Sequence, residues 1–431
     1  MSAKPVIVGL LGCGSVGGAL VELLAERAPA IEDNTGLRLR IGSVAVRSAA
    51  RSRNGLADEL LTTDARAVVN DPGIDIIVEV IGGIEPAREL ILEAMKNGKS
   101  VVTANKELLA NCGAELYSAA ADAGVDLLFE AAAAGAIPIV RPLRESLLGE
   151  DIRRIMGIVN GTTNYILTKM AEDGADYADA LSEAQRLGYA ERDPTADVEG
   201  FDAGAKAAIM ASLAFGARVV AGDVYHEGIS EVTQADIAFA HRLGYEIKLL
   251  AIAEVFDGPA GREIGVRVHP SMVPADHPLA SVRDSYNAVF VECAAAGQLM
   301  FYGRGAGGRP TASAVLGDLV DAGLNLGQRS HRRVPGGAQP AKIRPIDELE
   351  TAYYLNLEVD DSPGVLAEVA GVFGRHGVSI RSMEQEGLER DARLVFITHL
   401  AKERDFQATV SELRSLDVVS GVRSLMRVIG E

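Results

Sequence analysis

A strand, a glycine-rich turn and a helix follow one another at the start of the chain, and this order constrains the fold most. "PVIVGLLG" (5–12) is an apolar run of strand length, and "GSVGGALVELLAERA" (14–28) has leucine and valine at helical spacing. Gly12, Gly14 and Gly17 form a GxGxxG pattern. Here the first glycine permits a tight turn, the second lets the backbone approach a pyrophosphate, and the third lets helix and strand pack closely. The pattern predicts a dinucleotide site at a helix N-terminus, with a plain tight turn as the alternative.

Further apolar strands alternate with helices such as "EPARELILEAMKNG" through the first third of the chain. The expected strands are "LRLRIGSVAV" (37–46), "IDIIVEVIG" (74–82), "GKSVVTANK" (98–106) and "GVDLLFEAAAAGAIPIV" (124–140). Their continuous Val and Ile runs indicate strands buried on both faces. We therefore expect a Rossmann-type parallel sheet covered by helices, an α/β domain of residues 1–137.

The rest of the chain predicts an α+β substrate or dimerisation domain (138–302), a linker and a small final domain. Its expected elements are a strand, polar turn and helix in "DIRRIMGIVNGTTNYIL", one helix in "ADVEGFDAGAKAAIMASLAFG", and two strands in "YNAVFVECAAAGQLMFYGRG". The helix "TASAVLGDLVDAG", within 303–325, is expected to pack back on the first domain. Residues 326–347, rich in Gly, Pro and Arg, have no apolar period and predict a linker. The last segment, 348–431, predicts strand–helix–strand–strand–helix–strand, a ferredoxin-like unit.

The composition excludes several classes of protein. The 431 residues exceed one ordinary core, and a net charge of −18 argues against nucleic acid or a membrane as partner. Cys13, Cys112 and Cys293 show neither a disulfide framework nor metal-ligand spacing, which fits a reducing compartment. The chain shows no signal-peptide layout and no apolar run of the about 18 residues that a membrane span needs. We expect a cytoplasmic protein.

The end of the second expected strand bears on which dinucleotide binds. An NAD site usually places Asp or Glu there for the ribose hydroxyls, but this strand is followed by Arg47, Arg51 and Arg53. Arginine is a fixed, charged fork that suits a 2′-phosphate. The sequence therefore favours NADP over NAD, with solvated basic residues as the alternative.

Two lysines stand where a substrate could be bound. Lys106 closes "VTANK" at the carboxyl end of an expected parallel strand, where open α/β sheets bind ligands, although a loop-capping surface lysine looks the same. Asp202 and Lys206 are four residues apart on an expected helix and share a face. Because "AAIMASLAF" follows Lys206, we expect this lysine to be partly buried and able to exchange a proton, rather than to form an exposed ion pair.

The surrounding residues indicate the substrate. Reduction of a carbonyl by hydride leaves an oxyanion that a lysine can neutralise, and nearby carboxylates can bind a substrate ammonium group. This combination predicts an amino-acid alcohol or aldehyde. The histidines and cysteines lack zinc-ligand grouping. Cys112 and Cys293 are expected to be packing residues rather than thioester nucleophiles, and His241 to lie on a helix surface.

Six segments resemble homoserine dehydrogenase. They are "GLLGCGSVGG", "VTANKELLA", "FEAAAAGAIPIV", "NGTTNYIL", "LGYAERDPTADVEGFDAGAK" and "YGRGAGGRPTASAV", which occur in the family's order over residues 1 to 325. The fifth segment is highly specific to that family. The final unit, with "DDSPGVLAEVAGVFGRHGVSI", resembles an ACT domain, a small-molecule sensor.

The resemblance implies a NAD(P)-dependent oxidoreductase that interconverts L-homoserine and L-aspartate 4-semialdehyde, on the route to threonine and methionine. It implies that Lys206 transfers the proton and that Lys106 is a second active-site lysine. The implied substrate-binding residues are Glu191, Asp197, Asp202, Tyr189, Gly161 and Thr162. The expected cofactor contacts are Gly12, Gly14, Val16, Gly17, Arg47, Ile81, Thr103, Lys106 and Gly303.

The resemblance also implies a monovalent cation and an effector. Glu130, with the backbone carbonyls of Ala133, Gly135 and Ile137, matches the family's sodium site, although Ala136 and Ala133 depart from the usual glycine and valine. A carboxylate with carbonyl oxygens is reasonable chemistry for a hard cation; a structural strand-to-helix turn is the alternative. The ACT-like unit implies L-threonine as effector, bound near "DSPGVL".

Other interpretations remain open from the sequence. The protein could be a nucleotide-dependent amino-acid sensor without turnover, or a dehydrogenase for another amino-acid semialdehyde. A homodimer through the middle domain or a homotetramer through the ACT-like ends is expected. Within the stretch 188–206, Glu191, Asp197 and Asp202 are expected to face the substrate, Asp193 to shape the turn, and Glu199 to face solvent.

Overall fold

The computed structural model of this protein describes residues 4–48, 56–258, 261–328, 331, 339–388 and 391–430. The chain forms two compact units and passes between them several times. The first unit comprises Met1–Ile155, Gly204–Val224 and Tyr286–Ala341, and the second comprises Met156–Ala203, Tyr225–Ser285 and Lys342–Glu431. Each unit therefore combines segments that lie far apart in the sequence.

The first unit contains the expected parallel sheet. Its strand order is β3-β2-β1-β4-β5-β6, the order of a doubly wound dinucleotide-binding sheet. The strands are β1 (Val6–Leu11), β2 (Leu39–Ala45), β3 (Leu61–Thr62), β4 (Ile76–Glu79), β5 (Ser100–Thr103) and β6 (Leu127–Leu128). All five neighbouring pairs are parallel. The Rossmann-type sheet expected from the Val and Ile runs is confirmed.

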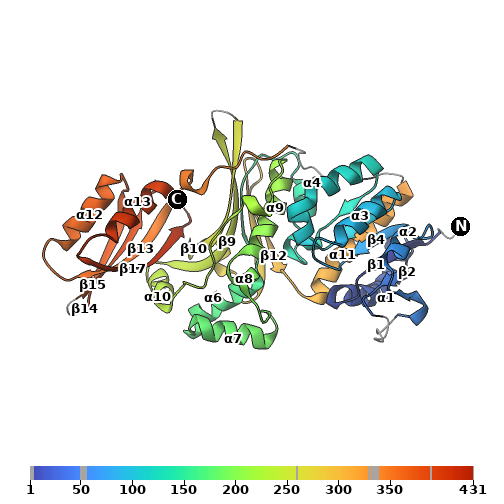
Figure 1. The fold of residues 1–431 in the computed structure, drawn as a ribbon, viewed down its shortest axis with the longest axis horizontal. Helices are drawn as coiled ribbons and strands as arrows, with labels where there is room; N and C mark the ends of the chain where they lie inside the picture. The colour runs from blue at the N-terminus through green and yellow to red at the C-terminus, as the bar shows by residue number, and fades with distance from the viewer. Residues whose placement is uncertain are drawn as a thin grey trace. The chain divides into compact units, whose positions relative to one another are not determined.

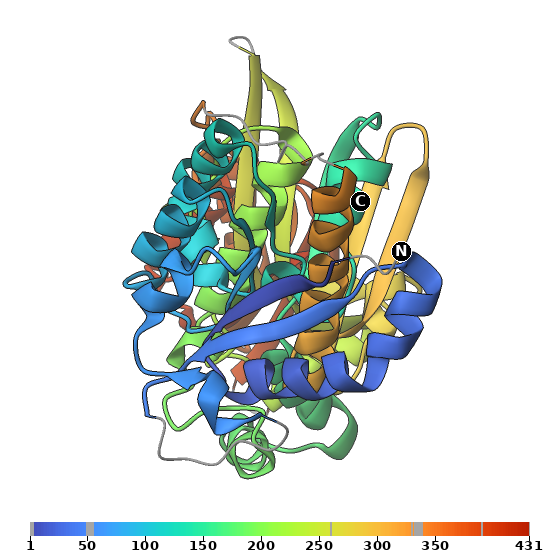
Figure 2. The same ribbon diagram turned by 90° about the vertical axis from the view of Figure 1, so that its right-hand side faces the viewer.

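Helices cover this sheet, and one of them comes from much later in the chain. The crossover helices are α1 (Ser15–Thr35), α2 (Ala65–Asn70), α3 (Ala87–Lys96) and α4 (Lys106–Ala123). Helix α11 (Gly308–Gln328) packs on α1, and its Ala312, Val315 and Leu319 are buried in the same apolar core as Leu20 of α1. Figure 2 shows α11 in orange together with the blue α1 and β1.

The last strand of the parallel sheet is shorter than expected. Only Leu127–Leu128 pair with β5, and the chain then turns into the short helix α5 (Ala131–Ala134). Glu130 already has helical backbone angles, and its N–H donates to the Asp318 carboxylate on α11 at 2.7 Å. The N–H of Glu130 is thus bonded by a buried side chain of α11 and not by a neighbouring strand.

The first unit also holds the hairpin β11 (Tyr286–Cys293) and β12 (Gly297–Arg304), and β7 (Ile152–Ile158) begins in this unit and continues into the second after Ile155. β11 and β12 pair antiparallel from Tyr286↔Arg304 to Cys293↔Gly297. This confirms the two strands joined by a small-residue turn.

The second unit is built on a long hairpin, β9 (Tyr245–Gly258) and β10 (Gly261–Pro274), with the short strand β8 (Tyr225–His226) beside β10. Its helices include α6 (Gly161–Asp173), α7 (Tyr177–Leu187), α8 (Thr195–Val198) and α10 (Gln234–Arg242). α9 (Phe201–Phe215) begins in this unit and continues into the first one. The single helix expected over residues 196–216 is therefore wrong: Gly200, with φ +83°, separates α8 from α9.

The C-terminal segment has the predicted strand–helix–strand–strand–helix–strand order, with one additional two-residue strand, β16, before the second helix. Its elements are β13 (Glu350–Asp360), α12 (Val365–Arg375), β14 (Ile380–Leu388), β15 (Asp391–Thr398), β16 (Ala401–Lys402), α13 (Glu403–Leu413) and β17 (Val419–Val428). The strands lie in the order β17-β13-β15-β14, with α12 and α13 on one face (Figure 1). Tyr353, Phe373 and Phe396 lie in the core between sheet and helices. β17 also pairs with β10, through Ser271↔Arg427 and Met272↔Val428.

The expected linker is structured at both ends. α11 runs to Gln328, and the N–H of Ile264 donates to the carbonyl of Lys342 at 2.9 Å. Among the described residues, no helix is long and apolar enough to cross a membrane.

Candidate active site

The glycine turn between β1 and α1 has room for a phosphate group. Gly12 has φ +98°, and a Cβ there would lie 2.8 Å from the carbonyl oxygen of Val80, so a side chain is excluded. A Cβ on Gly17 would lie 2.3 Å from the carbonyl oxygen of Gly12, whereas a Cβ on Gly14 would meet no atom within 4 Å. Helix α1 starts at this open position, which Gly14 caps. The turn therefore fits the pyrophosphate of a dinucleotide.

A buried carboxylate shapes the neighbouring loops at the same edge of the sheet. Glu79, at the end of β4, is fully buried, and one carboxylate oxygen accepts the N–H groups of Ile81 (2.7 Å) and Gly82 (3.2 Å). Its other oxygen accepts the Thr103 hydroxyl at 2.6 Å. Thr103 Oγ1 in turn accepts the N–H of Asn105, whose side chain caps α4. Ile81, Thr103 and the start of α4 are thus held by one network.

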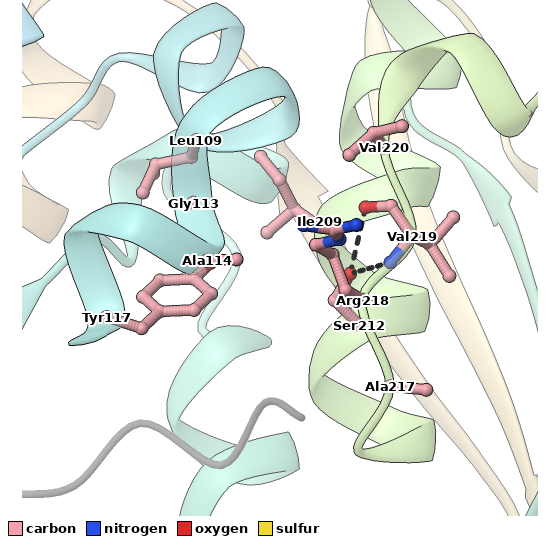
Figure 3. Close-up of a pocket in the computed structure, with 10 residues that line it drawn as sticks. All are labelled: Leu109, Gly113, Ala114, Tyr117, Ile209, Ser212, Ala217, Arg218, Val219 and Val220. Carbon is pink, nitrogen blue, oxygen red and sulfur yellow. Dashed lines mark hydrogen bonds between the residues drawn. The ribbon is translucent and has the colours of Figure 1, made fainter. Parts of the chain in front are cut away.

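The two candidate lysines both lie in helices of the first unit. Lys106 is the exposed first residue of α4, and Lys206, in the first turns of α9, is only 7% exposed. Leu109 on α4 and Ile209 on α9 line one narrow crevice (Figure 3). Each follows its lysine by three residues, and the two helices run in the same direction in Figure 3. The first turns that carry the lysines therefore lie at the same end of this helix pair.

The crevice itself is a packing contact and not a substrate pocket. Its volume is about 10 Å³, which holds about one water molecule. Ser212 Oγ accepts the N–H of Val219 at 3.0 Å and donates to its carbonyl at 3.1 Å, which fastens the chain after α9 to the helix (Figure 3). The predicted burial of Lys206 is confirmed.

Asn160 brings two of the predicted carboxylates together in the second unit. Its Nδ2 donates to Asp197 at 2.7 Å and to Asp202 at 2.9 Å, while its Oδ1 caps α6 by accepting the N–H of Thr163. Asp202 is 8% exposed and lies one turn before Lys206 on α9. The arrangement presents negative charge directly before a buried lysine.

The other residues of this stretch differ in their environment. Tyr189 is half exposed, its ring lies 4.9 Å from that of Tyr165, and its carbonyl accepts the hydroxyl of the buried Thr162 at 2.8 Å. Gly161 follows Asn160 as the first residue of α6. Glu191 is exposed between α7 and α8, so the structure does not bring it to the pair as it does Asp197.

Asp193 and Glu199 also have distinct contacts. Asp193 accepts the N–H (3.2 Å) and hydroxyl (2.7 Å) of Thr195, which shapes the turn as expected. Glu199 was expected to face solvent. It is instead half-buried and accepts a hydrogen bond from the hydroxyl of Ser230 at 2.9 Å.

Glu130 is buried at the turn where a cation was expected. Its two carboxylate oxygens accept the N–H groups of Val140 (2.7 Å) and Arg141 (2.9 Å), and burial raises its pKa despite these bonds. Asp318 lies beside it and accepts a hydrogen bond from Arg141 at 2.9 Å; burial raises the pKa of Asp318 to about 7.

The segment after Glu130 packs closely on the β12 end. A Cβ on Gly135, which has φ +61°, would lie 2.2 Å from the carbonyl oxygen of Gly305, just after Gly303. Ala133 and Ile137 are buried on either side. Among the described residues, no three His, Cys, Asp or Glu side chains gather as metal ligands, so any cation here would depend on backbone oxygens.

The structure also gives the surroundings of the cysteines, of His241 and of two predicted cofactor contacts. Burial raises the pKa of the Cys112 and Cys293 thiols, which opposes a thiolate nucleophile, and His241 lies exposed beside Glu246. Val16 is half-buried in the first turn of α1, and Arg47 is exposed just after β2. Arg51 and Arg53 lie outside the described residues.

Sequence reasoning assigned no role to Asn160 or Glu79. A signal existed for both: Asn160 occupies an N-cap position after a strand, and Glu79 is an acid inside an otherwise apolar run.

A doubly wound sheet with a glycine turn, followed by a carboxylate–lysine site, defines a nicotinamide-dependent oxidoreductase with an added C-terminal sensor-like domain. Comparison with known families refines this class. The family profile "Homoserine dehydrogenase, NAD binding domain" matches residues 12–130, "Homoserine dehydrogenase" matches 138–320, and "ACT domain" matches 353–418.

Similar proteins cover the whole chain. The homoserine dehydrogenase of Corynebacterium glutamicum is 52% identical over 429 residues, 98% of this chain and 95% of the relative. A crystal structure of a homoserine dehydrogenase from Thiobacillus denitrificans has a TM-score of 0.92 at 43% identity and covers 99% of this chain and 98% of that one. A hyperthermophilic archaeal homoserine dehydrogenase in complex with NADPH has a TM-score of 0.64 at 31% identity, over 75% of this chain and 98% of its own. The chain belongs to the homoserine dehydrogenase family.

Proposed function

We propose that this protein interconverts L-homoserine and L-aspartate 4-semialdehyde, in the synthesis of threonine and methionine. The observation that carries the proposal is the Asn160 amide, which bonds both Asp197 and Asp202; Asp202 lies one helical turn before the buried Lys206. Two carboxylates suit the ammonium group of an amino acid, and a buried lysine suits proton transfer at its side-chain hydroxyl.

In the oxidation, the hydroxyl O–H bond breaks and its proton passes to the Nζ of Lys206 as the carbonyl forms. A bound nicotinamide cofactor supplies the acceptor for the hydride that leaves the same carbon. In the reverse direction Lys206 returns the proton to the developing oxyanion. Burial favours the neutral amine that accepts a proton, and Asp202 favours the charged form that donates one. Lys106, on the adjacent helix start, adds positive charge for the oxyanion.

The substrate would be oriented by its ammonium group. Asp197 and Asp202 supply the negative charge, and Thr162, Gly161 and Tyr189 lie on the segments next to Asn160. Glu191 would have to approach from its exposed loop to join them.

The cofactor would lie over the glycine turn and the loops held by Glu79. Gly14 offers the open approach for the pyrophosphate, and Ile81, Thr103 and Gly303 lie on segments at the strand ends. We propose NADP as the preferred dinucleotide because Arg47 follows β2 where a ribose-binding acid would otherwise stand.

A sodium ion and a threonine effector complete the proposal. The lone pairs that remain on Glu130, with the carbonyls of Ala133, Gly135 and Ile137, would hold the cation. The ACT domain, the last of the domains 1–137 with 303–325, 138–302 and 348–431, would bind L-threonine in a homodimer or homotetramer.

Initial rates with L-homoserine test the function. We expect reduction of NADP⁺ with higher kcat/KM than of NAD⁺, and Arg47→Ala should narrow this difference. The matched control is 4-hydroxybutyrate, which has the same carboxylate and hydroxyl as L-homoserine and lacks only the amino group. It should react at least about 100-fold more slowly, since a buried site left without its partner discriminates strongly. No reduction of either cofactor by L-homoserine would refute the proposal.

A further inference from the structure

A buried arginine joins the C-terminal sheet to the loop that follows β8. Arg427 on β17 is 1% exposed, and its guanidinium donates to both carboxylate oxygens of Glu227 at 2.8 and 2.9 Å. It also donates to both oxygens of Glu403, the first residue of α13, at 2.9 and 2.8 Å. Two bidentate pairs fix the guanidinium from two sides.

The hydrogen bonds from Arg427 favour the charged form of the Glu227 carboxylate, although burial opposes it. Burial opposes ionisation of Glu227, but the hydrogen bonds from Arg427 hold the pKa of Glu227 below its usual value. Such a partly buried pair is weak evidence for stability, because desolvation offsets much of the attraction. Its strict geometry is better suited to fixing the position of one segment against another.

The segment after Glu227 presses on the junction between α8 and α9. A Cβ on Gly228 would lie 2.4 Å from the carbonyl oxygen of Val198, and the N–H of Ile229 donates to this oxygen at 2.9 Å. Ser230 donates to Glu199 at 2.9 Å. The two backbones are therefore in direct contact at Gly228 and Val198.

This junction lies between the two candidate substrate carboxylates. Residues 198–200 connect Asp197 to the helix that carries Asp202, and Asn160 bonds both carboxylates. A displacement of Glu227 would move the junction and change the separation of the carboxylates. The whole path, from Arg427 to Asn160, lies within the second unit.

We propose that Glu227 is a positioning residue for Asp197 and Asp202, and that Arg427 couples this position to the C-terminal domain. The inference rests on the proposed function, in which these carboxylates bind the substrate's ammonium group. The state of the C-terminal domain then sets the affinity for the amino-acid substrate and leaves the cofactor site unaffected.

Glu227→Gln in the full-length protein is the test, because Arg427 keeps Glu403 as a partner. We expect the KM for L-homoserine to rise about 5- to 20-fold, with kcat and the KM for NADP⁺ within about twofold of wild type, as for a residue that affects substrate binding only. The matched control is Glu358→Gln, which removes a Glu–Arg pair with Arg423 on neighbouring strands of the same sheet. It should change none of these constants.

A double-mutant cycle tests the role of Arg427. Arg427→Lys keeps the positive charge but loses the planar guanidinium that bonds both oxygens of a carboxylate, so it should raise the KM for L-homoserine as well. The KM for L-homoserine of the double variant should be no higher than that of the more affected single variant, since both substitutions act through one contact. The proposal is overturned if Glu227→Gln leaves this KM unchanged, raises both KM values equally, or lowers only the melting temperature. A wild-type protein that does not oxidise L-homoserine would instead refute the proposed function.

Discussion

At the scale of single residues, Asn160 does two separable things. Its amide nitrogen bonds Asp197 and Asp202, while its amide oxygen caps α6. The donors hold two like charges together at one place, and the acceptor stabilises the helix that begins beside them. A substitution that keeps the cap and removes the donors can therefore test the site without loss of the fold.

Asn160→Ser is that substitution, because serine is about as good an N-cap as asparagine. Hydrogen bonds to charged groups contribute about 1.5–3 kcal/mol, so the KM for L-homoserine should rise about 10- to 100-fold. The melting temperature should stay close to wild type. Asn97→Ser, which removes a surface amide after α3, is the control for the substitution itself. An unchanged KM would show that Asn160 does not organise the substrate carboxylates.

The sequence predicts some of these residues and not others, for a physical reason. The burial of Lys206 could be predicted because "AAIMASLAF" follows it directly on the same helix. The bonds of Asn160 join positions 37 and 42 residues apart, and the Arg427–Glu227 pair spans 200 residues. No local pattern encodes such contacts, which only the tertiary fold creates.

At the scale of elements, the break between α8 and α9 sets the direction of the helix that carries Asp202 and Lys206. Gly200 adopts φ +83°, and a Cβ there would lie 2.9 Å from Val268 Cγ1 on β10. The backbone angle and the close approach both require glycine at this position.

Gly200→Ala should destabilise the protein and raise the KM for L-homoserine. Gly174→Ala is a matched control, because Gly174 has a similar φ of +68° but no atom within 4 Å of a Cβ. A left-handed alanine costs about 1–2 kcal/mol, which both variants should lose in their free energy of unfolding. Only Gly200→Ala should lose more than this in its free energy of unfolding, and only this variant should change the KM for L-homoserine. Equal losses and unchanged kinetics in both would contradict a role for the close packing.

His269, a residue of β10, makes the free energy of unfolding depend on pH. It is fully buried, and its Nδ1 lies 3.1 Å from the carbonyl oxygen of Pro270 and 2.9 Å from Ser271 Oγ. Burial, with the charges of Arg427 and Arg267, holds the pKa of His269 well below its usual value. The folded protein therefore keeps this imidazole neutral, whereas the unfolded chain binds a proton near pH 6.5.

Because the folded pKa is lowered, the stability that His269 contributes is present above about pH 6.5 and is lost as the pH falls. The free energy of unfolding should decrease by up to about 1.4 kcal/mol per pH unit below that point. Denaturant unfolding between about pH 7.5 and about pH 5 should show a shallower slope for His269→Gln than for wild type. Parallel curves would mean that His269 does not titrate on unfolding.

The elements themselves were largely predictable. The parallel strands and the C-terminal order follow from apolar runs of characteristic length, and the hairpin β11–β12 follows from its small-residue turn. The exceptions are the short β6 and the break at Gly200. Asp318 accepts the N–H of Glu130 just after β6, and Val268 lies against Gly200; both are distant in the sequence.

At the scale of the whole molecule, each unit assembles its function from separated segments. The glycine turn, Lys106 and Lys206 all belong to the first unit, although Lys206 follows a stretch of the second. Leu109 of α4 and Ile209 of α9 line one crevice in this unit, which also contains the parallel sheet and α11. The candidate substrate carboxylates, Asp197 and Asp202, share the second unit with the ACT domain.

The turnover number of Lys206→Ala with L-homoserine and NADP⁺ tests the central claim most directly. General acid–base catalysis contributes about 10²- to 10⁴-fold, so kcat should fall by that factor while NADP⁺ binding and the melting temperature are retained. Lys169→Ala, which removes a lysine paired with Asp173 on α6, should turn over like wild type. A Lys206→Ala variant with a kcat close to wild type would contradict the assignment of Lys206 as the proton-transferring residue.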